Sequence, residues 1–74
     1  MRSPQFTRRT ESPEPDDIRR IRAAAGHSQS QAAWVAYSTL RSWQAWEAGE
    51  RRMPLAMFVL YRLRTGQITL AELD

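Results

Sequence analysis

The sequence predicts an all-α fold, a compact bundle of four to five helices. Apolar residues recur at helical spacing in several segments, and capping residues or a proline stand where these segments begin. The 3 glycines follow three of the segments and can supply the left-handed conformation in which many helices end. A chain of 74 residues has the length of one small domain, so we expect a small core.

The first helix is expected from about Pro15 to Gly26. Its apolar face carries Ile18 and Ile21 at helical spacing. The segment before it, residues 1–14, is rich in proline, serine and arginine and contains one aromatic residue, Phe6. This composition predicts a flexible basic arm.

The second helix is expected to begin at Gln29. The Ser28 hydroxyl can accept a hydrogen bond from a free backbone N–H, while the Gln31 amide reaches back to close a capping box. Small apolar residues lie close around one face of this helix and allow another helix to approach closely. They are Ala32, Ala33, Val35 and Ala36.

The third helix is expected over Leu40 to Glu47, with Thr39 as its cap and Gly49 at its end. Trp43 and Trp46 are spaced i, i+3, so both indoles can point inward. The opposite surface is then shared by Leu40, Arg41, Gln44 and Ala45.

A fourth helix is expected from Pro54 at its first position to about Arg64. It is apolar around most of its circumference, which is typical of a buried helix, and a short chain cannot cover both sides. One stripe, Ala56, Val59, Leu60 and Leu63, is expected to pack on the other helices. The second stripe and the tail, residues 67–74, predict a homodimer interface of Met57, Phe58, Tyr61, Ile68, Leu70 and Leu73. Residues 68–73 fit a short helix capped by Thr69 or a short strand.

Composition excludes several kinds of site. The chain has no cysteine and one histidine, which excludes disulfides, cysteine metal sites and a histidine ligand cluster. No nucleophile–base pair or phosphate loop is recognisable, so we expect no enzyme, no cofactor and no small-molecule substrate. No apolar run reaches the length of a membrane span, and a cytoplasmic protein is expected.

Arginine clusters point instead to a polyanion. All 11 basic residues are arginines, which bind phosphate bidentately. Clusters of basic side chains are the usual footprint of a nucleic-acid partner. The clusters are Arg2, Arg8 and Arg9, then Arg19, Arg20 and Arg22, then Arg51 and Arg52.

The stretch from Gly26 to Pro54 resembles the phage-repressor, or Cro and xenobiotic-response-element, superfamily of helix-turn-helix DNA-binding domains. The family pattern runs Gly, apolar, Ser, Gln, a helix, a turn, Ser or Thr, a recognition helix, and Trp-Glu-x-Gly-x-Arg. The residues that match it without a gap are Gly26, Ser28, Gln29, Ala33, Thr39, Trp46, Glu47, Gly49 and Arg51. The resemblance covers Asp16 to Gly66 and implies a lambda-repressor-like bundle, with residues 15–66 as the DNA-binding domain.

Two positions depart from the family pattern. Tyr37 stands where the family usually has the glycine of the turn, and Ser38 where it usually has Val or Ile. A tyrosine at positive φ is uncommon and costly. We therefore expect a differently shaped turn, with the Tyr37 ring filling the space of the missing Val.

The resemblance and the residue types together predict the contacts with double-stranded DNA. An Arg and a Gln on the exposed surface of the third helix are suited to reading base edges. The expected base-reading residues are Leu40, Arg41, Ser42, Gln44 and Ala45, and the expected phosphate contacts are Gln29, Ser30, Thr39, Arg51 and Arg52. Glu47 is expected in polar contacts inside the domain, and Trp34 on the surface.

These expectations describe a sequence-specific transcriptional regulator, a dimeric autorepressor of a phage or mobile-element operon that binds an inverted repeat. The run from Arg41 to Met53 is similar to a group of anti-CRISPR-associated repressors. Such a protein would work in the bacterial cytoplasm, at the nucleoid. The sequence leaves one alternative open, the antitoxin of a toxin–antitoxin pair or another protein-interaction module.

Overall fold

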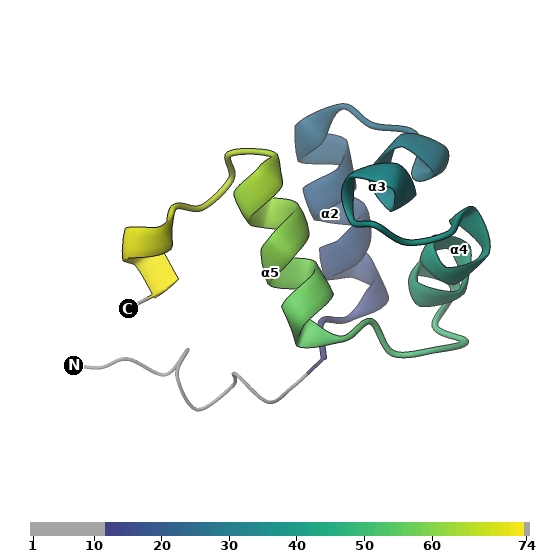
Figure 1. Cartoon of the computed structure of the whole chain (residues 1–74). Coiled ribbons are helices and arrows are strands. Elements are labelled where there is room, and N and C mark those ends of the chain that lie inside the picture. The colour runs from purple at the N-terminus through teal and green to yellow at the C-terminus, as the bar shows by residue number, and fades with distance from the viewer. Residues whose placement is uncertain (1–11, 74) are drawn as a thin grey trace.

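Residues 12–73 are described by the computed structural model, and they form four α-helices and one 3₁₀ helix without any strand (Figure 1). The elements are α2 (Pro15–Ala25), α3 (Gln29–Val35), α4 (Leu40–Ala48), α5 (Leu55–Arg64) and η1 (Leu70–Leu73). The predicted all-α fold is therefore confirmed. The predictions for residues 1–11, including Arg2, Arg8 and Arg9, fall outside the described residues.

The helices begin and end where the local signals place them. The Ser28 hydroxyl accepts from the Gln31 N–H at 3.1 Å, and the Ser28 N–H donates to the Gln31 side chain at 2.8 Å. Thr39 caps α4 by accepting from the Ser42 N–H at 3.1 Å. Gly49 ends α4 at φ 78°, in the left-handed region. Only the start of α5 differs, because Pro54 is the capping residue and not the first helical one.

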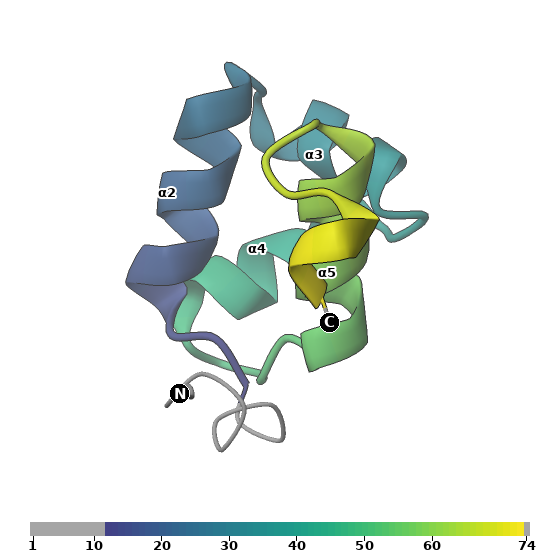
Figure 2. The same ribbon diagram turned by 90° about the vertical axis from the view of Figure 1, so that its left-hand side faces the viewer.

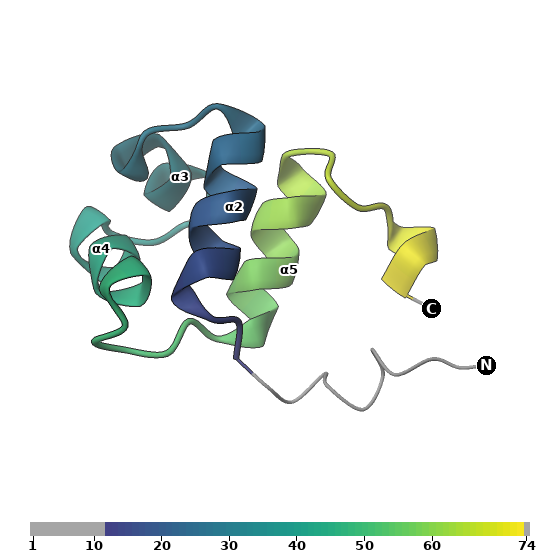
Figure 3. The ribbon, with the colours of Figure 1, turned by 180° about the vertical axis from the view of Figure 1, so that it is seen from behind.

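The core lies where α2, α3 and α4 meet α5. Figure 2 shows α2 on one side and α5 on the other, with α4 crossing between them, and Figure 3 shows the same bundle from behind. Three alanines keep the inner side of α3 flat, and large rings from α4 and α5 fill the space opposite. The Trp43 and Tyr61 rings stand 5.0 Å apart, centroid to centroid. The core residues are Ile18, Ile21, Ala32, Ala33, Ala36, Trp43, Trp46, Met53 and Tyr61.

The prediction for the two faces of α5 is wrong. Tyr61 is fully buried within the chain, and Met57 and Phe58 pack against the same core. The stripe expected inside, with Ala56 and Leu60, lies on the outer side and is exposed or half-buried. Tyr61 is therefore not available for a dimer interface, and Met57 and Phe58 are half-buried, with part of each side chain engaged in the core.

Tyr37 also contradicts its prediction. Its φ is 57°, so the connection between α3 and α4 keeps a left-handed residue at the usual position of glycine. The ring is 72% exposed and fills no interior space. It lies under the guanidinium of Arg64, whose Cζ is 4.5 Å from the ring centroid.

The tail forms the helical alternative. The Thr69 N–H donates to the Glu72 carboxylate at 2.6 Å, and this contact closes the first turn of η1. Figures 1 and 2 place η1 beside α5, on the side away from α2. Ile68 is half-buried, and Leu70 is exposed. The predicted role of Leu73 falls on a side chain outside the described part.

Candidate nucleic-acid interface

The outer face of α4 carries a row of exposed side chains, of which two are polar. Leu40, Arg41 and Gln44 are exposed, while Trp43 and Trp46 fix the opposite face in the core. With the residues described, Arg41 forms no ion pair. A shallow hollow of about 890 Å³ runs from α4 into the following loop. It is lined by Arg41, Gln44, Ala45, Ala48, Glu50 and Arg51.

Beneath this face, Glu47 is the centre of a buried polar network. The Glu47 side chain is 5% exposed. Its carboxylate accepts from Arg22 Nε at 2.6 Å and Nη2 at 3.0 Å, and from the Trp43 indole N–H at 2.6 Å. The Gln29 amide donates a further bond at 3.1 Å. Because these donors belong to α2, α3 and α4, the network fixes the three helices to one another, and Glu47 makes the polar contacts inside the domain that were expected.

These contacts set the ionisation of Glu47. Burial alone would raise its pKa, but hydrogen bonds from Arg22, Trp43 and Gln29 outweigh burial and lower the pKa below the ordinary value. A carboxyl group whose pKa is lowered by folding stabilises the folded state only when ionised. This contribution is complete above the pKa of the unfolded carboxyl, about 4.3, and is lost as pH falls through the lower folded value.

We therefore expect the free energy of unfolding to decrease as pH falls below about 4.3. Urea titrations followed by circular dichroism between neutral and acid pH would measure the slope. The Glu47→Gln variant lacks this carboxyl, so its stability should fall less steeply in the same range. An equally steep loss in the variant would assign the acid sensitivity to other carboxyl groups.

Several predicted DNA contacts are already engaged within the chain. The Gln29 amide donates to Glu47 and accepts from Gln44 Nε2 at 3.4 Å, so this predicted phosphate contact is joined to a predicted base contact. Arg51 Nη2 donates to the Ser42 hydroxyl at 2.8 Å. The structure thus brings α3, α4 and the loop after α4 together at one face. Ser30, Thr39 and Arg52 are exposed.

Ala45 corrects the predicted exposed surface. Its side chain is 8% exposed, so Ala45 belongs to the buried side of α4 and not to the exposed row. It lies at the floor of the hollow, where only a small part of the methyl group is accessible. The exposed row of α4 is therefore narrower than the sequence pattern indicated.

The arginines of α2 are a second correction. Arg19 pairs with Asp16 and donates to the Glu47 carbonyl oxygen, and Arg20 pairs with Asp17 at 3.0 Å. Arg22 is the partner of Glu47. This cluster, read from the sequence as a polyanion footprint, is neutralised within the fold. Arg51 and Arg52 are the cationic cluster that stands beside α4.

Sequence reasoning missed the contact between His27 and Tyr61. The His27 Nδ1 and the Tyr61 hydroxyl are 2.7 Å apart, and the rings meet edge to face. Burial raises the pKa of Tyr61, opposed by the nearby Arg22 cation. The pair joins the start of α3 to α5. His27 is a polar residue directly before the capping residue Ser28, and this position could have indicated a hydrogen bond. Its partner Tyr61 lies 34 residues away in the sequence and could not be identified.

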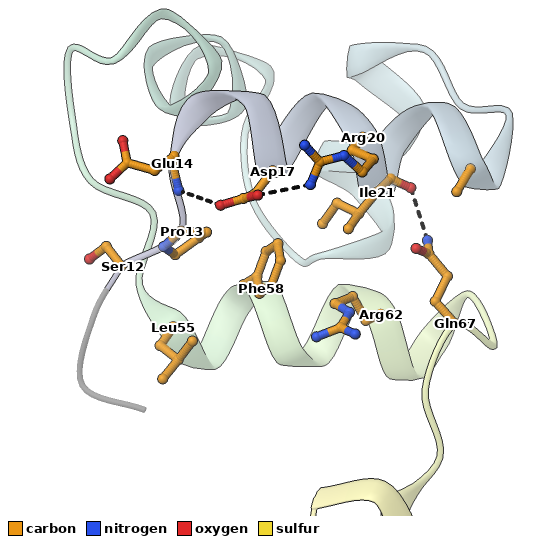
Figure 4. Close-up of a pocket in the computed structure, with 11 residues that line it drawn as sticks. Ser12, Pro13, Glu14, Asp17, Arg20, Ile21, Leu55, Phe58, Arg62 and Gln67 are labelled. Carbon is orange, nitrogen blue, oxygen red and sulfur yellow. Dashed lines mark hydrogen bonds and ion pairs between the residues drawn. The ribbon is translucent and has the colours of Figure 1, made fainter. Parts of the chain in front are cut away.

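A separate groove lies between α2 and α5 (Figure 4). Its volume is about 570 Å³, and its floor includes Ile21, Leu55 and Phe58. Asp17 pairs with Arg20 at its edge, and Arg62 stands over the Phe58 ring at 5.2 Å. No α4 residue lines this groove. Its mixed charges do not continue the cationic surface beside α4.

Two further searches of the described residues give negative findings. No group of three or more His, Cys, Asp or Glu side chains could hold a metal ion there. No helix in that part of the chain is long and apolar enough to cross a membrane. In comparisons with known proteins, no family model and no curated protein matches the chain.

Proposed function

We propose that the chain is a sequence-specific DNA-binding transcriptional regulator. The observation that supports this is the two-sided character of α4: its inner face is fixed by Trp43, Trp46 and Glu47, and its outer face presents Arg41 and Gln44. An α-helix fits the major groove, where arginine pairs with guanine and glutamine with adenine. An anchored helix with exposed Arg and Gln side chains is suited to this task.

The surroundings of α4 support docking on a duplex. Arg51 and Arg52 stand in the loop that follows the helix, where they can contact phosphates and set its register. Leu40, at the exposed start of α4, can contact a thymine methyl group. In this proposal α3 and α4 act as a helix-turn-helix, and Gln29 and Ser30 approach the backbone from the start of α3.

We propose further that the regulator acts as a dimeric autorepressor of phage or mobile-element type. A two-fold dimer would place its two α4 helices in successive major grooves, about 34 Å apart, and would therefore select an inverted repeat. Occupation of its own promoter would then block transcription. Gel-shift binding to the upstream region of its gene, against scrambled DNA of equal length, tests the proposal at about 150 mM salt, where nonspecific attraction is weakened.

Arg41→Ala should lower affinity for the selected sequence by about 1 to 3 kcal/mol and relax the preference at one base pair. The reason is the loss of a bidentate contact with guanine O6 and N7. Binding to a set of operators with single base changes measures both effects. Arg20→Ala, a change in an exposed arginine on α2 that lies outside α4 and pairs with Asp17, is the matched control and should leave the base preference unchanged. A uniform loss on every sequence with Arg41→Ala would make Arg41 a phosphate contact.

One observation favours a second candidate, a protein-interaction module such as an antitoxin. Trp34 is 77% exposed on α3, and aromatic residues are enriched at protein interfaces relative to the rest of the surface. Equal binding to operator and scrambled DNA, or no binding, would move the assignment to this class.

A further inference from the structure

A strained residue at the end of α3 carries an exposed ring. Tyr37 adopts φ 57°, a left-handed conformation that is unfavourable for residues other than glycine. Its ring is largely outside the fold, so burial offsets little of this cost. Its contact is with Arg64, whose Nη1 donates to the Tyr37 hydroxyl at 2.8 Å. The fold itself gains little from a tyrosine at this position, which points to a role on the surface.

Tyr37 is one of three exposed residues, with Trp34 and Arg64, of the types that dominate protein interfaces. Trp34 lies three residues earlier, and its carbonyl oxygen accepts from the Tyr37 N–H at 3.1 Å. Tryptophan, tyrosine and arginine are the residues most enriched among those that carry binding energy. We call Trp34, Tyr37 and Arg64 the aromatic patch.

The aromatic patch continues along the outer side of α5. Ala56, Leu60 and Arg64 are spaced i, i+4, i+8 and so form one stripe, which is exposed or half-buried. The connection between α3 and α4 lies on one flank of α5, and η1 lies on the other (Figure 1). On η1, Leu70 is 72% exposed, and the neighbouring acidic residue Glu72 is exposed as well. One flank is therefore cationic and aromatic, and the other is acidic and aliphatic.

We propose that a second copy of this chain docks along the stripe Ala56–Leu60–Arg64, with Leu70 and Glu72 of each copy on the aromatic patch of the other. A two-fold axis parallel to α5 sets each flank of one copy against the opposite flank of the other, so each contact is made twice. Each Arg64 then meets a carboxylate, and the exposed aliphatic and aromatic side chains cover one another. This inference rests on the proposed dimeric regulator. It keeps Leu70 from the interface predicted from the sequence and replaces the predicted residues on α5.

Sedimentation equilibrium of the full chain without DNA tests the proposal. Arg64→Glu and Glu72→Arg should each raise the dimer dissociation constant at least about five-fold, the effect of losing one well-packed interface side chain. The double variant restores opposite charges across the interface and should return the constant close to that of the original chain. Tyr37→Gly removes the ring while keeping the left-handed turn, and it should weaken the dimer without lowering the melting temperature.

The matched control is Arg62→Glu, which reverses a charge two residues away on α5 but off the stripe. It should leave the dissociation constant unchanged. A monomer at every concentration, or a dimer insensitive to Arg64→Glu and Tyr37→Gly, would overturn the inference. The inference would also be overturned if the chain were monomeric and another protein bound the aromatic patch. DNA selection is measured separately, so a monomer that selects an operator would refute this interface and leave the proposed function standing.

Discussion

Glu47→Ala is expected to destabilise the fold by about 3 to 5 kcal/mol, the cost of leaving one member of a buried ion pair unpartnered. The carboxylate is 5% exposed and accepts from Arg22, Trp43 and Gln29. Its removal leaves the half-buried Arg22 guanidinium and the buried indole N–H without their acceptor. Small domains have a total stability of about 5 to 15 kcal/mol, so this loss is a large fraction of the total and should lower the urea midpoint strongly. Urea unfolding followed by circular dichroism measures the loss.

Glu50→Ala is the matched control, because Glu50 is an exposed carboxylate near the end of the same helix. It should change the free energy of unfolding by less than about 0.5 kcal/mol. Glu47→Gln keeps the shape of the side chain and part of its accepting capacity, so we expect an intermediate loss. A change below about 1 kcal/mol for Glu47→Ala would mean that Arg22 and Trp43 find water or other acceptors, and the network would not fix the helices.

The helix ends could be predicted because their causes lie within a few residues. Ser28 and Gln31 exchange hydrogen bonds across three positions, and Thr39 reaches Ser42 across the same distance. Gly49 ends α4 through its own backbone conformation. Such contacts need no knowledge of the rest of the chain, so the order and bounds of the helices follow from the sequence with small errors.

The orientation of α5 could not be predicted, because both of its sides are apolar. Helical periodicity identifies a stripe but does not choose between two stripes of similar hydrophobicity. Packing decides the choice: the alanines on α3 leave room that Phe58 and Tyr61 fill and that Val59 or Leu63 would fill less well. The aliphatic stripe was expected inside, and Tyr61 of the other stripe is buried in the core.

In the candidate site, too, local features could be predicted from the sequence and contacts between distant residues could not. Exposure of Leu40, Arg41 and Gln44 follows from the inward direction of the two tryptophans on the same helix. The pairing of Arg22 with Glu47 spans 25 residues, and that of Gln29 with Glu47 spans 18. One signal was present: Glu47 shares the face of Trp43 and Trp46, and a carboxylate on a buried face requires a cation.

Trp43→Phe is expected to cost about 2 to 3 kcal/mol, because it removes a hydrogen-bond donor from a buried carboxylate and also leaves space beside Tyr61. Trp46→Phe is the matched control: Trp46 is also buried and meets Trp43 edge to face, but no hydrogen bond of its indole is found within residues 12–73. It should cost less.

Combination with Glu47→Gln separates the hydrogen bond from packing. Trp43→Phe and Glu47→Gln act on one network, so their effects on the free energy of unfolding should be non-additive by about 0.5 to 3 kcal/mol, whereas Trp46→Phe and Glu47→Gln should come closer to additivity. Loss of the indole donor should also raise the pKa of Glu47, because this bond helps to lower it. Acid unfolding of Trp43→Phe would then begin at higher pH than that of Trp46→Phe. Equal acid profiles and equal coupling in the two tryptophan variants would show that Trp43 contributes packing alone, and that Arg22 and Gln29 suffice to hold the carboxylate under α4.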